Sequence, residues 1–143
     1  MSKSPDQQVL HRQLLTCLRG EWNSLAVVPA SASFSASFVA KALVEVSTLV
    51  HGAPARYFST EDLDLTSVSK VIVDMANHVE KGGKAVVCVD SVMGAQSGVP
   101  IAISADAALL VVHLGVTTTD DAKNTLEVIG ADKFIGAVTL ETV

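Results

Sequence analysis

A serine-rich stretch has the residue types and spacing that point most directly to chemistry. Residues 30 to 37 read ASASFSAS, between the apolar run LAVV (25 to 28) and the helix-like segment FVAKAL (38 to 43). A phosphate-binding loop has this layout, with the pattern G-x-x-x-x-G-K-[ST] between a strand and a helix. In that register Ser37 stands at the hydroxyl position that holds magnesium in such loops.

The rest of that pattern is missing. Ala30 and Ser35 stand where the two glycines would be, and Ala36 stands where the lysine would be. The glycines permit close approach of the backbone to anionic oxygens, and the lysine adds a charge-assisted contact that contributes about 1.5 to 3 kcal/mol. Phosphoryl transfer depends on positioning and on that charge, so we expect no catalysis from this loop. It is instead a plain connection with Ser35 or Ser37 as helix cap, or a weak anion site at the helix start.

A carboxylate follows a second apolar run. Asp90 comes directly after AVVCV (85 to 89). In an open parallel sheet the ligand site forms at the carboxyl ends of the strands, so the two loops would meet there. Asp90 then either orients a magnesium ion or caps its own loop. The predicted nucleotide or anion site is vestigial, with no catalytic residue, no metal site and no cofactor, although weak Mg-ATP binding stays open; its residues are Ser33, Ser35, Ala36, Ser37 and Asp90.

Apolar runs and amphipathic segments alternate along the chain and predict the scaffold of these loops. Val-rich runs without polar alternation are typical of strands buried on both faces. They are LAVV, AVVCV, AALLVV (107 to 112) and FIGAV (134 to 138), with ARYFS (55 to 59) as a weaker fifth strand. Apolar residues at intervals of four, three and four predict two helices, with stripes of Val39, Leu43, Val46 and Val50 and of Val68, Ile72, Met75 and Val79.

Two further helices complete the expected order. One covers about 119 to 129, with Thr119 as cap and Gly130 at its end, and the other runs from about Asp6 to Leu18. Strands that alternate with helices call for parallel pairing and right-handed crossovers. The predicted fold is therefore α/β: a three-layer α/β/α sandwich like that of P-loop NTPases, with a mostly parallel sheet of about five strands, formed by residues 1 to 143 as a single domain.

Composition excludes several classes of function. The chain has 143 residues, of which 49% are hydrophobic, and its net charge is −5 with scattered basic residues, so we expect no nucleic-acid partner. Cys17 and Cys88 lie in apolar stretches, which favours buried thiols in the cytoplasm over a disulfide. The four histidines show no zinc-ligand spacing. No apolar run approaches the about 20 residues of a membrane helix, so we expect no direct membrane insertion.

The second half of the chain resembles a known family. Residues 84 to 140 contain a hydrophobic strand ending near Asp90, the pair Ala105 and Asp106, LLVVHLG (109 to 115) and IGAV (135 to 138). This order is similar to that of the MinD/ParA-like ATPases, particularly the bacterial tyrosine kinases of capsule and exopolysaccharide biosynthesis. HRQLLTCLRGEWNSLAVVPAS, upstream, resembles the helix that precedes the nucleotide loop in those kinases, so the resemblance covers roughly residues 10 to 140.

The chain also departs from those kinases. Glu61, Asp62 and Asp64 supply acid after the second strand, but no arginine follows them, and Tyr57 is the one tyrosine where the kinases carry a tyrosine-rich tail. Autokinase activity is therefore not expected. The resemblance and the missing loop residues together imply a degenerate domain that acts through protein–protein interaction in polysaccharide biosynthesis or export.

Partners and alternatives follow from the same resemblance. The implied partner is a polysaccharide chain-length or export component at the inner membrane, through which a cytoplasmic domain would reach the membrane, and homo-oligomer formation stays open. One alternative is a nucleotide-binding ATPase or kinase with an unconventional phosphate loop. A small receiver-like or carrier-like regulatory domain is the third, because many functions share this type of sheet; a receiver would need two acids after its first strand, and LAVVPAS has none.

Overall fold

The structure, a computed structural model, describes residues 22 to 31, 36 to 51, 55 to 60, 65 to 92 and 98 to 141. Strands and helices alternate along these residues. In chain order they are β1 (Ser24–Pro29), α2 (Ser37–His51), β2 (Ala55–Ser59), α3 (Leu65–Glu80), β3 (Lys84–Cys88), α4 (Val99–Ser104), β4 (Ala107–Leu114), α5 (Thr119–Ile129), a 3-10 turn (Ala131–Lys133) and β5 (Phe134–Glu141).

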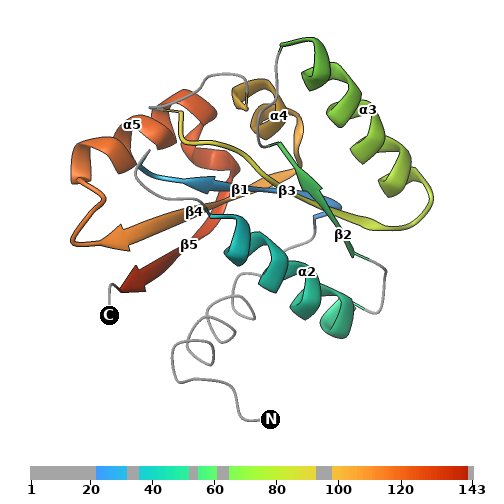
Figure 1. The fold of residues 1–143 in the computed structure, drawn as a ribbon, viewed down its shortest axis with the longest axis horizontal. Coiled ribbons are helices and arrows are strands. Elements are labelled where there is room, and N and C mark those ends of the chain that lie inside the picture. The colour runs from blue at the N-terminus through green and yellow to red at the C-terminus, as the bar shows by residue number, and fades with distance from the viewer. Residues whose placement is uncertain (1–21, 32–35, 52–54, 61–64, 93–97, 142–143) are drawn as a thin grey trace.

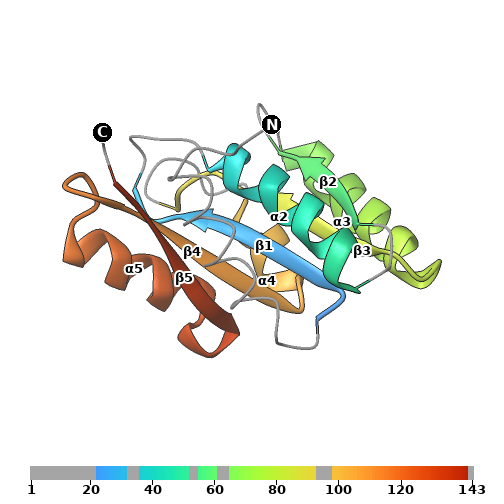
Figure 2. The ribbon, with the colours of Figure 1, turned by 90° about the horizontal axis from the view of Figure 1, so that it is seen from below.

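The strands form one sheet in the order β2-β3-β1-β4-β5, and each neighbouring pair is parallel. Helix α2 lies on one face of the sheet, and α3, α4 and α5 lie on the other (Figure 1). Turning the molecule by 90° shows the length of β1 between β3 and β4 (Figure 2). The predicted three-layer α/β/α fold and its parallel five-stranded sheet are confirmed.

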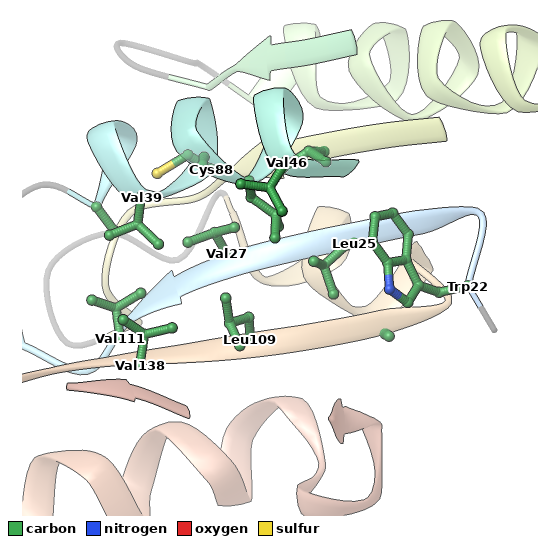
Figure 3. Close-up of a cluster of buried hydrophobic side chains, with 14 residues drawn as sticks. Trp22, Leu25, Val27, Val39, Val46, Cys88, Leu109, Val111 and Val138 are labelled. Carbon is green, nitrogen blue, oxygen red and sulfur yellow. The ribbon is translucent and has the colours of Figure 1, made fainter. Parts of the chain in front are cut away.

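Strand β1 explains why the predicted strands were apolar throughout. Its side chains alternate between two cores: Leu25 and Val27 belong to the cluster on the α2 side, whereas Ala26 and Val28 belong to the cluster under α3, α4 and α5. All four are fully buried. Figure 3 shows the α2-side cluster, in which Val39 and Val46 of α2 pack over β1 and its neighbours. A central parallel strand is covered on both faces and so has no polar side.

The predicted helix stripes face these cores. Val39, Leu43 and Val46 are buried on α2, and Val68 and Met75 are buried on α3, with Ile72 and Val79 half-buried. The side chain of Val50, the expected helix from Asp6 to Leu18, and Cys17 lie outside the described residues.

Three local details differ from the sequence-based expectation. The cap of α5 is Thr118, one residue earlier than Thr119, and its hydroxyl accepts a hydrogen bond from the Asp121 amide at 3.1 Å. Strand β3 ends at Cys88, before Val89. Helix α4 was not expected, because six residues are too few to show a helical period. Gly130 ends α5 as predicted, with a φ of +109°.

Candidate functional site

The topology defines where a ligand would bind. The chain leaves β1 toward α2 on one face of the sheet, but it leaves the neighbours β3 and β4 toward α4 and α5 on the opposite face (Figure 1). Loops that leave adjacent strands toward opposite faces diverge, and open α/β sheets bind ligands in the resulting crevice at the carboxyl ends. Two such places flank β1, one beside β3 and one beside β4.

Ala36, at the position of the missing lysine, lies inside the core. It is fully buried and belongs to the α2-side cluster with Val39 and Ala40. Its carbonyl oxygen accepts hydrogen bonds from the amides of Val39 at 3.0 Å and Ala40 at 3.2 Å. Ala36 therefore stands at the cap position of α2 with a side chain that accepts no hydrogen bond.

The other predicted residues of the loop are placed only in part. Ser37 is the first residue of α2 and half-buried, so the cap position that was expected for Ser35 or Ser37 falls on Ala36. Ser33 and Ser35 lie outside the described residues. Ala30, at the first glycine position, is fully buried, and its amide donates to the Val111 carbonyl oxygen at 2.9 Å. This bond extends the contact between β1 and β4 beyond the end of β1.

Asp90 reaches the same edge of the sheet from β3. The amide of Val89 donates to the Val27 carbonyl oxygen at 3.1 Å, which holds the segment after β3 against β1. Asp90 follows and is exposed. Of the predicted site residues, the structure thus brings Ala36, Ser37 and Asp90 to the carboxyl ends of the two neighbouring strands β1 and β3.

Buried hydroxyl groups lie at the carboxyl ends of the strands, and they are not among the predicted site residues. Ser31, Thr60 and Ser91 are each 4% exposed and follow β1, β2 and β3 within three residues. The Thr60 hydroxyl donates to the Cys88 carbonyl oxygen at 2.5 Å, which ties the end of β2 to β3. Their one signal in the sequence is a small hydroxyl residue shortly after an apolar strand, a pattern too common to identify a site.

A hydroxyl pair joins the segments that follow β1 and β4. The Oγ of Ser31 and the Oγ1 of Thr117 are 3.1 Å apart, so the loop after β1 is hydrogen-bonded to the turn after β4. Thr117 is itself fixed, because its Oγ1 accepts from the His113 amide at 3.0 Å and its amide donates to the His113 carbonyl oxygen at 2.8 Å. This bridge occupies the position beside β4, so the position beside β3, where Asp90 follows the strand, is the candidate ligand site.

Asp106, the second aspartate that matches the family pattern, lies at the opposite end of the strands. Asp106 precedes β4, and its Oδ2 accepts hydrogen bonds from the amides of Asn23 at 2.9 Å and Ser24 at 3.3 Å. The Asp106 amide in turn donates to the Ser24 hydroxyl at 2.8 Å. This reciprocal pairing joins the starts of β1 and β4, so Asp106 positions the sheet at the end opposite to the candidate ligand site.

The described residues hold no group of three or more His, Cys, Asp or Glu side chains that could bind a metal ion. In the same part of the chain, every helix is too short or too polar to cross a membrane.

Comparison with known proteins gives a structural match alone. No protein-family profile matches the chain, and no curated protein matches it in sequence. The fold is similar to the crystal structure of the chimerical protein CapA2B2, with a TM-score of 0.70 and 13% sequence identity. The match covers 99% of this chain and 86% of that chain. At this identity the likeness shows a related fold.

Proposed function

We propose that this chain is a non-catalytic relative of the P-loop ATPases that acts by binding another protein in polysaccharide biosynthesis or export. The observation that carries the proposal is the burial of Ala36 in the α2-side cluster. A phosphate loop needs a cation at this position, directed at the phosphates. Here the position holds a methyl group buried in the α2-side cluster, so it supplies no positive charge for a phosphate.

The remaining polar groups favour protein structure over ligand binding. Ser31 and Thr60 direct their hydroxyls to Thr117 and to the Cys88 carbonyl oxygen. Asp90 is an exposed carboxylate, which repels phosphate oxygens in the absence of a cation. A triphosphate would thus meet the Asp90 carboxylate with no lysine from the loop to balance its charge.

Apolar side chains at the same edge support a protein contact. Phe38, in the first turn of α2, is 50% exposed, and Leu114 and Val116, where β4 ends, are 45% and 40% exposed. A contiguous exposed apolar patch marks a protein interaction site, and we propose that these three side chains belong to one. The resemblance to capsule and exopolysaccharide kinases supports a chain-length or export component as the partner, at the inner membrane.

Calorimetric titration with ATP, with and without Mg²⁺, tests the loss of nucleotide binding. We expect no heat of binding under either condition, and micromolar affinity would contradict the proposal. The partner is tested by co-purification with the polysaccharide chain-length protein of the same genome. Phe38→Ser should weaken that association, whereas Val73→Ser, which alters an equally exposed residue on α3, should leave it unchanged.

The alternative is an ATPase or kinase with an unconventional loop, and the exposed position of Asp90 beside β1 favours it. In that case Mg²⁺-dependent nucleotide binding would be present, and Asp90→Asn would abolish the Mg²⁺ dependence. The same titration therefore separates the two functions.

A further inference from the structure

The described helices cover the α2-side face of the sheet unevenly. Helix α2 packs on β1, β2 and β3, and in Figure 2 it lies clear of β5. Yet Leu109 and Val111 of β4 and Val138 of β5 are fully buried members of the α2-side cluster. A side chain on one face of a sheet is enclosed only when another layer packs over that face. The described helices thus leave the cover of these three side chains to be assigned.

Trp22 shows on which face the chain enters the sheet. It lies two residues before β1, is 2% exposed and belongs to the same cluster (Figure 3). The Lys84 amino group, at the start of β3, donates to the Trp22 carbonyl oxygen and lies 5.5 Å from the centroid of the Trp22 ring. The residue that follows the N-terminal segment is therefore held at the amino ends of the strands, on the α2 side.

We propose that residues 6 to 18 cover the α2-side face of β4 and β5. Residues 1 to 21 precede Trp22, whereas each of the other segments outside the described residues has five residues or fewer. The sequence predicts a helix over residues 6 to 18, with Leu10, Leu14 and Cys17 along one side. An apolar stripe of this kind packs on a sheet face of leucine and valine side chains.

The length of this segment matches the face. Val138 pairs with Val111, and Val111 pairs with Pro29, so Val138 lies level with the end of β1. The six residues of β1 extend for about 20 Å, at about 3.3 Å per residue. A helix over residues 6 to 18 is also about 20 Å long, at about 1.5 Å per residue. A helix that ends near Trp22 therefore reaches from the amino ends of the strands to Val138.

The two cysteines allow a test in the full chain. Cys17 lies in the segment, and Cys88 is buried in the α2-side cluster at the end of β3. A thiol reagent labels accessible cysteines, and mass spectrometry assigns each label to its position. We expect both thiols of the wild type to react slowly, because both are enclosed. A Cys17 thiol that reacts in the wild type as fast as a free cysteine overturns the proposal.

A displaced segment should uncover β5. Val138→Cys adds a reporter on this strand, and Leu14→Asp should displace the segment because a carboxylate is costly to bury. We expect Leu14→Asp to accelerate labelling at positions 17 and 138 by about tenfold or more, while Cys88 stays protected beneath α2. Thr16→Asp is the matched control, since it adds the same charge to the opposite side of the predicted helix and should change neither rate.

A reporter at position 138 that stays protected while Leu14→Asp exposes Cys17 overturns the proposal, because another segment then covers β5. Labelling of Cys88 would reveal that Leu14→Asp unfolds the chain. Leu14→Ala then takes its place, and labelling at positions 17 and 138 must accelerate together or the proposal fails. The inference does not rest on the proposed function, because thiol labelling and nucleotide titration report on different parts of the molecule.

Discussion

At the amino ends of the strands, the carboxylate of Asp106 accepts hydrogen bonds from two backbone amides and joins β1 to β4. At the carboxyl ends, the carboxylate of Asp90 is exposed. Both residues follow the order of the same family resemblance, yet among the described residues only Asp106 is hydrogen-bonded into the scaffold. The difference lies in position: amides at the strand starts converge on Asp106, while Asp90 follows β3, and β3 and β1 lead to helices on opposite faces of the sheet. Both aspartates match the family pattern, but the end of the strands at which each one lies decides its role.

The largest expected effect is at Ala36, near the carboxyl ends of the strands, and it tests whether this side chain is enclosed in the core. Ala36→Lys places an ammonium in the fully buried α2-side cluster, and we expect it to lower the free energy of unfolding by about 3 kcal/mol or more. Denaturant titration measures the change. Phe38→Lys is the control, because half of that side chain is exposed and its charge can stay in water. A stable Ala36→Lys variant that binds ATP would contradict the enclosure of this side chain in the α2-side cluster.

The next effect is at Asp106, at the amino ends of β1 and β4. Asp106→Ala removes the acceptor of the Asn23 and Ser24 amides, and we expect a loss of about 1 to 2 kcal/mol in the free energy of unfolding. Asp106→Asn should recover part of this loss, since its amide oxygen still accepts. Equal stability of the wild type and Asp106→Ala would mean that the two hydrogen bonds contribute nothing net.

A smaller effect concerns the hydroxyl pair between the loops. Ser31→Ala should cost about 0.5 to 1.5 kcal/mol, because the bridge to Thr117 is lost. A double-mutant cycle with Thr117→Val isolates the pair, and we expect a coupling energy of at least about 0.5 kcal/mol. Strictly additive effects of the two substitutions would contradict a hydrogen-bonded bridge between Ser31 and Thr117.

The smallest effect is expected at Asp90. Asp90→Ala changes an exposed carboxylate and should alter the free energy of unfolding by no more than about 0.5 kcal/mol. The same denaturant titrations compare it directly with Asp106→Ala. A loss as large as that of Asp106→Ala would mean that the carboxylates at the two ends of the strands contribute equally to stability.

Most of the scaffold could be predicted, because periodicity reflects burial. The Val-rich runs became strands, and the stripes of α2 and α3 turned inward. Helix α4 was missed because its stability comes from tertiary packing of Ile101 and Ala102. Gly98, at its start, permits a close approach that sequence does not reveal, since a Cβ there would lie 2.8 Å from the Val89 Cβ.

The candidate site was predictable only as a location. Loop order placed Ala36, Ser37 and Asp90 at the carboxyl edge, and parallel strands required this. Which hydroxyl partners join the loops could not be predicted, because Ser31 and Thr117 are 86 positions apart in the chain and meet only through the pairing of β1 with β4.

The sequence by itself determined the alternation of strands and helices and the absence of glycines and lysine from the loop, because both are properties of residue type and local spacing. Only the tertiary structure decided that the Ala36 side chain packs into the core, that Asp106 braces the sheet and that β5 is an edge strand. These features depend on strand order, and strand order arises from contacts between segments distant in the chain, which no local pattern records.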